Sequence, residues 1–150
     1  MRLISDEEDF ALVLAEEHSI LFFYVDWSVY AVQGRQLVEE LESTFYGDLN
    51  VSCWIADVSD INSSPALLGE WLRKQDRGDL KMFNPAICGN GSVAWLARGE
   101  VIDFVQSATH YKLHELRNQT REAFQNRAID ETSALECAVE PSENHDHDFQ

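Results

Sequence analysis

Hydrophobic positions along the chain alternate between helical spacing and short continuous runs. Phe10, Val13 and Leu14 follow a helical period after the capping-box pattern Ser5-Asp6-Glu7-Glu8. The aromatic-rich run at 20–26 is unbroken and too short for a helix, which favours a strand buried on both faces. The first half of the chain therefore predicts a short edge strand at 2–4, a helix at 6–17, a strand at 20–26, a helix at 29–45 and a strand at 51–56.

The second half continues the alternation. It predicts a helix opened by Ser64-Pro65, strands at 92–97 and 101–105 joined by a hairpin turn at 98–100, and a last helix capped by Thr109. Strands linked through helices pair in parallel by right-handed crossovers, and a hairpin adds antiparallel pairs. We therefore expect an α/β fold, with a central mixed β-sheet flanked by helices on both faces.

Amino-acid composition and net charge limit the classes of partner that the chain can bind. The 150 residues are 45% hydrophobic, which is enough for the core of one domain, and 27 acidic against 11 basic side chains give a net charge of −16. This field repels phosphate backbones and anionic lipids, so neither nucleic acid nor a membrane is expected as a partner. The acidic surface either attracts basic segments of other proteins or serves solubility alone.

Acidic residues are concentrated at the C-terminal end. Residues 129–150 contain seven acidic side chains, no Lys or Arg and few large apolar groups, so they bury too little surface to offset the entropy lost on ordering. We expect a folded domain at 1–128 and a disordered acidic tail at 129–150.

The three cysteines and the N-terminal segment indicate where in the cell the protein is expected. Cys53, Cys88 and Cys137 form no C-x-x-C pair, and an odd count does not suit a disulfide framework. The N-terminus turns acidic at once, and no apolar run approaches the ~20 residues of a membrane span. A cytoplasmic location is the expectation.

A tryptophan turn, Trp27-Ser28-Val29-Tyr30-Ala31, connects the strand at 20–26 to the next helix. Backbone N–H groups and the helix dipole at such a place stabilise a thiolate. Together with the element order, Phe22-Phe23-Tyr24-Val25-Asp26-Trp27 before that helix and Arg98-Gly99-Glu100-Val101 in the hairpin, the chain resembles the thioredoxin family from about Ser5 to Phe124. The resemblance implies a thioredoxin-like fold.

The chain departs from the family pattern at three places. In the family's W-C-x-x-C motif the Trp matches, but Ser28 and Ala31 occupy both sulfur positions. Phe22 stands where the family carries a buried carboxylate, and Gly91 stands where it carries a cis-proline. Disulfide exchange needs an attacking thiolate and a second thiol that resolves the mixed disulfide. We therefore expect a redox-inactive member that is not an enzyme, with no catalytic residues and no cofactor.

The expected function is that of a protein-binding adaptor or chaperone-like module. Its groove for a protein or peptide partner would be formed by Trp27, Ser28, Val29, Tyr30, Ala31, Asn90, Gly91 and Ser92. Trp27 and Tyr30 either border this groove or are tucked against the sheet. Two alternatives stay open, namely a single-thiol redox protein that uses Cys88 and a structural subunit of a homodimer.

Other candidate residues have simpler interpretations. Cys53 is expected in the core and Cys137 in the tail, and no metal site is expected at His145-Asp146-His147-Asp148 or at His110 and His114. The chain is longer than a typical thioredoxin between Asp60 and Gly91. The basic side chains there either form a ledge for a partner or end a solvated helix; they are Arg73, Lys74, Arg77 and Lys81.

Overall fold

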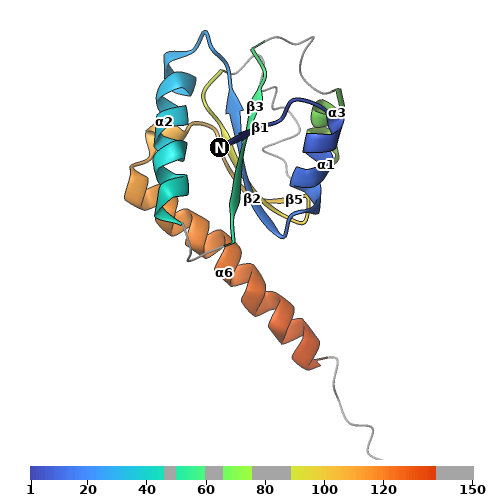
Figure 1. The fold of residues 1–150 in the computed structure, drawn as a ribbon. Coiled ribbons are helices and arrows are strands. Elements are labelled where there is room, and N and C mark those ends of the chain that lie inside the picture. Colours follow the sequence, from blue (N-terminus) through green and yellow to red (C-terminus); the bar gives the residue numbers. More distant parts are fainter. Residues whose placement is uncertain (46–49, 60–65, 76–88, 138–150) are drawn as a thin grey trace, which may run out of the picture.

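The computed structural model describes residues 1–45, 50–59, 66–75 and 89–137, with residues 66, 67 and 126–137 described by their backbone alone. Strands and helices alternate until a C-terminal hairpin and a last long helix (Figure 1). The elements are β1 (Arg2–Leu3), α1 (Glu7–Ala15), β2 (His18–Tyr24), α2 (Val29–Thr44), β3 (Ser52–Asp57), α3 (Ala66–Lys74), β4 (Val93–Ala97), β5 (Glu100–Val105), the 3-10 turn η1 (Ala108–His110) and α6 (Leu113–Cys137).

The five strands form one mixed sheet in the order β1-β3-β2-β4-β5. The two pairs that involve β3 are parallel, and β4 runs antiparallel to both β2 and β5. The parallel pair β2–β3 is joined through α2, and β1 reaches its place beside β3 through α1, β2 and α2. The antiparallel pair β4–β5 is joined by a tight turn, as the spacing of the apolar runs predicts. The expected α/β class with a mixed sheet is confirmed.

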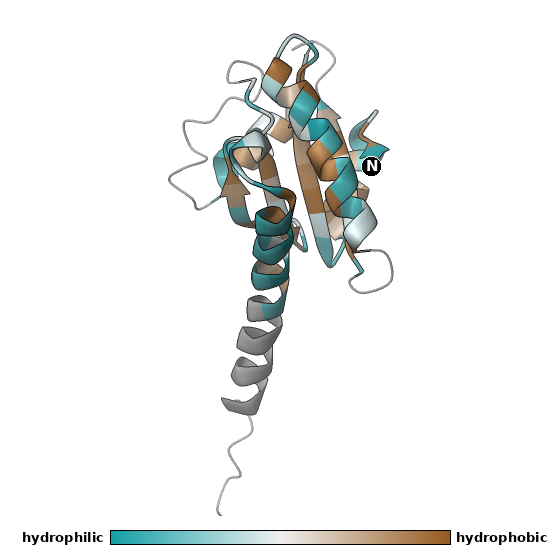
Figure 2. Cartoon of the chain, turned by 90° about the vertical axis from the view of Figure 1, so that its left-hand side faces the viewer, coloured by the Kyte–Doolittle hydropathy of each residue, from teal (hydrophilic) through white to brown (hydrophobic). Residues whose placement is uncertain are grey.

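Alternating side chains of the central strands feed two separate cores. Along β2, Leu21 and Phe23 pack with α1 and α3, whereas Ile20 and Phe22 pack with α2 and α6. Successive side chains of a strand point to opposite faces, so a continuous apolar run supplies both cores. Figure 1 shows the consequence, with α2 and α6 on one side of the sheet and α1 and α3 on the other. In Figure 2 the strands are hydrophobic and the outer side of α6 is hydrophilic.

The hairpin between β4 and β5 is tighter than expected. Ala97 pairs with Glu100, so the loop consists of Arg98 and Gly99 alone. Both have positive φ, 49° and 81°. A two-residue turn with both residues in this region matches the right-handed twist of the strands that it joins.

Several expected boundaries are corrected. The N-cap of α1 is Asp6 rather than Ser5, because the Asp6 Oδ1 accepts the Asp9 N–H at 2.9 Å and the Asp9 side chain accepts the Ser5 N–H. Thr109 lies in η1 and does not cap the last helix, which begins at Leu113. Strand β2 spans 18–24 rather than 20–26, since its pairing with β4 reaches back to His18.

The last helix continues to Cys137 and so crosses the expected domain boundary at 128 (Figure 1). Residues 138–150 lie outside the described part, and the disordered tail stays a prediction for them. None of the helices described is long and apolar enough to span a bilayer.

Candidate functional site

The tryptophan turn lies at the edge of the sheet where the parallel strands β2 and β3 end. The Val58 N–H donates to the Tyr24 carbonyl at 2.8 Å, and the Asp26 N–H donates to the Ser59 Oγ at 2.8 Å. These bonds hold the segments after the two strands together. Crevices outside the carboxyl ends of parallel strands are the usual ligand sites of open α/β sheets.

Ser28 acts as the N-cap of α2. Its backbone is extended, with φ −106° and ψ 123°, and its Oγ accepts the Ala31 N–H at 3.4 Å. Ser28 is 8% exposed and Ala31 is fully buried. The two positions that the resemblance aligns with the family's sulfur atoms therefore present a hydroxyl engaged in capping and a buried methyl group.

Four large apolar side chains around this cap face solvent. Trp27, Val29, Tyr30 and Val32 are exposed by 58%, 67%, 58% and 41%, respectively. We call these four side chains the turn surface. The interpretation in which Trp27 and Tyr30 are tucked against the sheet is therefore wrong. Exposed apolar side chains that gather in one place commonly mark interaction sites.

A glycine loop lies directly against this turn. An atom at the Cβ position of Gly91 would be 3.0 Å from the Tyr30 carbonyl oxygen and 3.1 Å from the Ala31 Cα, and Gly91 has φ +68°. At Gly89 the same atom would be 2.3 Å from the Trp27 ring. Only glycine permits this approach, so the loop and the turn form one surface. The expected proximity of Gly91 to the turn is confirmed.

The remaining expected site residues differ in exposure. Asn90 is exposed, whereas Ser92 is 2% exposed and its Oγ donates to the Gln106 carbonyl at 2.7 Å. Ser92 therefore supports the loop from within and presents no side chain to a partner. Cys88 lies outside the described residues.

A third segment, which the sequence did not single out, borders the same place. The Ala108 N–H donates to the Gly91 carbonyl at 2.9 Å, and the Ser107 and Thr109 hydroxyls are 2.9 Å apart. The sequence offered one signal for this segment, namely the small polar residues Ser107 and Thr109 shortly after the strand β5. Its position next to Gly91 follows only from the pairing of β4 with β5.

Two buried residues, Phe22 and Cys53, are relevant to whether the site can carry out thiol chemistry. Phe22, which the resemblance aligns with the family's carboxylate, is fully buried, and its ring lies 3.3 Å from where a Cβ on Gly34 would be. Cys53 is 3% exposed, as expected for a core cysteine. Burial, with a further contribution from the Glu42 carboxylate, raises the pKa of its thiol far above the usual range. Cys53 is therefore no nucleophile.

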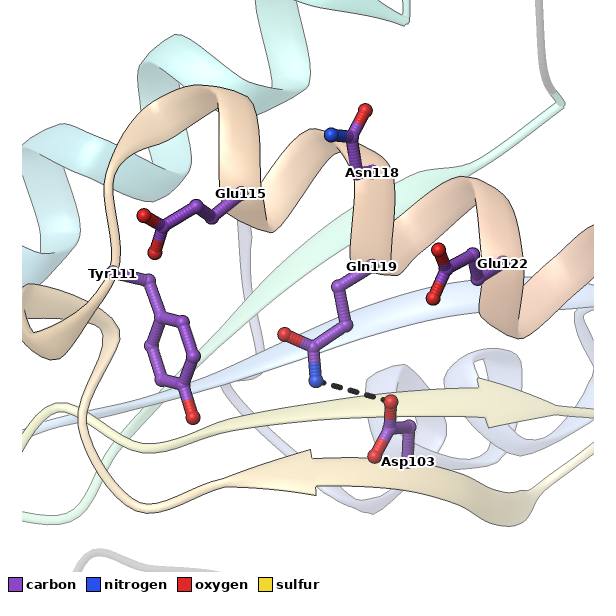
Figure 3. A pocket seen from close by; sticks show the side chains of 6 residues that line it. All are labelled: Asp103, Tyr111, Glu115, Asn118, Gln119 and Glu122. Atoms are coloured by element: carbon purple, nitrogen blue, oxygen red, sulfur yellow. Dashed lines mark hydrogen bonds between the residues drawn. The ribbon is translucent and has the colours of Figure 1, made fainter.

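A polar cleft of about 430 Å³ lies elsewhere, between β5 and α6 (Figure 3). The Gln119 amide donates to the Asp103 carboxylate across it at 3.0 Å. Its lining comes from segments that are separate in the sequence; it consists of Asp103, Tyr111, Glu115, Asn118, Gln119 and Glu122. The sequence did not predict it, because these residues follow no shared motif.

The described residues include some of the candidate metal ligands and some of the basic residues near α3. His110 and His114 are exposed, and within the described ranges no group of three or more His, Cys, Asp or Glu side chains is placed to hold a metal ion. The motif at 145–148 lies outside those ranges.

Arg73 and Lys74 are exposed in the last turn of α3, where cations complement the helix dipole. The other two basic residues of that segment, Arg77 and Lys81, lie outside the described residues.

Comparisons with known proteins identify the fold. No family model and no curated protein matches the chain. Among solved structures, the chain is similar to the oxidised thioredoxin of Plasmodium falciparum, with a TM-score of 0.56, 13% identity, and coverage of 79% of this chain and 96% of that one. The thioredoxin of Malassezia sympodialis has a TM-score of 0.56 at 14% identity, covering 83% and 90%. That of Trypanosoma brucei brucei has a TM-score of 0.57 at 12% identity, covering 82% and 89%. These matches show the thioredoxin fold and leave the activity open.

Proposed function

We propose that this protein is a cytoplasmic adaptor or chaperone-like module that binds an extended segment of another protein at the turn surface and carries out no dithiol exchange. The observation that supports this most is the exposure of Trp27 and Tyr30, each 58%, around a helix N-terminus whose cap is a serine. Exposed aromatic side chains are frequent anchors in protein interfaces.

The glycine loop offers a backbone partner beside these anchors. Asn90 is exposed, and no hydrogen bond joins its N–H or carbonyl to any other residue that the structure describes. Gly91 is buried and its carbonyl already accepts the Ala108 N–H, so Asn90 is the residue of this loop that a bound segment would meet. An extended peptide can bond to such a backbone while its side chains contact the aromatic anchors.

The absence of dithiol exchange is tested by insulin reduction. Ser28 and Ala31 supply no sulfur, and Cys53 is buried with a raised pKa. We expect no turnover above buffer, with an active thioredoxin as the positive control, because the tryptophan turn holds no pair of thiols to transfer electrons. Turnover comparable to the control would end this part of the proposal.

The single-thiol alternative has its own test. The assay is repeated with glutathione as the reductant, with the wild type and with Cys88→Ser. Activity that appears only in the wild type would support a lone reactive thiol at Cys88 in place of the adaptor role.

The binding part is tested by quantitative crosslinking in cells with the wild type, Trp27→Ala and Leu12→Ala. Leu12 on α1 is 49% exposed and serves as a matched apolar control. We expect a partner that the wild type and Leu12→Ala retain and that Trp27→Ala loses. Identical partners for all three proteins would count against the turn surface.

The homodimer alternative is tested by analytical sedimentation. A monomer at every protein concentration would remove this alternative.

A further inference from the structure

We propose that the segment bound at the turn surface carries Lys or Arg next to its apolar anchor. This inference rests on the proposed binding function and adds the chemical class of the partner. It depends on the charges at the rim of the turn surface.

Two carboxylates lie at the rim. Asp26 directly precedes Trp27, and Asp57 ends β3 opposite Tyr24 in the parallel register. Ser59 connects them, because its Oγ accepts the Asp26 N–H at 2.8 Å and its own N–H donates to the Asp57 Oδ1 at 2.9 Å. Both aspartates are exposed. The end of the sheet therefore presents two negative charges directly beside the apolar anchors.

In the described part, neither Asp26 nor Asp57 is neutralised by an ion pair. The segment from Trp27 to Gly34 contains no charged residue. The next one, Arg35, lies 5.3 Å from the centroid of the Tyr24 ring, but its ion pair is with Glu39, at 3.1 Å. The rim is thus acidic around an uncharged apolar centre.

A basic and apolar segment complements this arrangement. An ammonium or guanidinium group would approach the two carboxylates, while its aliphatic stem could cover part of the exposed rings. The net charge of −16 would also speed the approach of a cationic segment. A second copy of this chain would bring the same acidic rim and the same net charge to the interface, and like charges disfavour that pairing.

The test uses three blocked ten-residue peptides with a central Leu-Phe pair, flanked by lysines, glutamines or glutamates. Affinities are measured by fluorescence anisotropy at low ionic strength for the wild type, Asp26→Asn/Asp57→Asn and Trp27→Ala. The Asn side chain at position 57 retains an Oδ1 acceptor for the Ser59 N–H, so the loop geometry is preserved. Glu8→Gln/Glu40→Gln is the control with the same change in net charge, at exposed positions of α1 and α2 outside the turn surface.

We expect the lysine peptide to bind most tightly, and the double Asn variant to weaken it by roughly fivefold, because exposed charge pairs contribute modestly and are screened by salt. Binding of the glutamine peptide should be unchanged in that variant. The control pair should retain most of the lysine preference, and Trp27→Ala should weaken all three peptides.

Two results would overturn the inference in different ways. Equal binding of the lysine and glutamine peptides, sensitive to Trp27→Ala, would refute the basic partner and leave the proposed binding function intact. No binding of any peptide by the wild type would contradict both.

Discussion

At the scale of single residues, the candidate site is defined by a serine cap and a buried glycine. Ser28 supplies an oxygen that accepts the Ala31 N–H, which is a common use of serine at a helix N-cap. Gly91 supplies positive φ and the absence of a Cβ. Both residues stabilise the local backbone, and neither offers redox chemistry. Their neighbours Trp27 and Tyr30 are exposed, and we propose that they provide binding.

Gly91→Ala tests how closely the glycine loop is packed against the turn. We expect a loss of about 2 kcal/mol in the free energy of unfolding, since a Cβ at φ +68° would lie 3.0 Å from the Tyr30 oxygen. Gly69→Ala is the matched control: its nearest neighbour is the flexible Arg73 side chain at 3.6 Å, and alanine in a helix gains up to about 1 kcal/mol. Urea unfolding followed by tryptophan fluorescence measures both. Equal stability of Gly91→Ala and the wild type would contradict the close packing.

At the scale of elements, α6 is joined to the sheet by a buried polar contact. The Trp95 indole N–H donates to the Thr120 Oγ1 at 2.8 Å, and that hydroxyl donates to the Leu116 carbonyl at 2.8 Å. Trp95 and Thr120 are both fully buried. A buried indole N–H needs an acceptor, so this contact determines which turn of α6 lies over β4.

Thr120→Val should remove the acceptor while conserving the shape of the side chain. We expect a loss of about 1–3 kcal/mol in the free energy of unfolding, because the buried indole N–H would be left unsatisfied. Thr120→Ser retains the hydroxyl and should lose less than Thr120→Val. Thermal and urea unfolding of the three proteins measures the difference. A valine variant as stable as the serine variant would show that the hydrogen bond contributes nothing.

At the scale of the whole molecule, the excess of negative charge lowers the stability of the folded state through repulsion. A net charge of −16 on a folded chain is a source of self-repulsion that unfolding relieves, because unfolding moves the charges apart. The two described ion pairs, Met1–Glu42 and Arg35–Glu39, involve few of these acidic groups. Stability should therefore depend on screening by salt.

Raising NaCl from about 0.01 M to 0.1 M shortens the screening length from ~30 Å to ~10 Å. We expect an increase of about 4 °C in Tm, corresponding to a gain of about 1–2 kcal/mol in a chain of this size. Circular dichroism melts measure Tm, and glycerol at matched osmolality controls for general solvent effects. A Tm that stays constant or falls with salt would mean that self-repulsion is not significant.

The order of the elements and the division of the core could be predicted from the sequence because both depend on local periodicity. The continuous run of β2 places Leu21 and Phe23 in one core and Ile20 and Phe22 in the other by alternation alone. The absence of a C-x-x-C pair is likewise visible in the sequence. The caps were less predictable, since Ser5 and Asp6 are both competent, and in the structure the Asp9 N–H donates to the Asp6 side chain.

The sequence by itself thus determined the class of fold, the burial of the strand at 20–26 on both faces and the absence of a C-x-x-C pair, because these depend on residue type and spacing. Only the tertiary structure decided that Trp27 and Tyr30 face solvent, that Ala108 lies next to Gly91, and that Asp26 and Asp57 meet at one rim. Each of these depends on contacts between segments distant in the chain. Such contacts are created when the strands pair, and local hydrophobic periodicity contains no information about them.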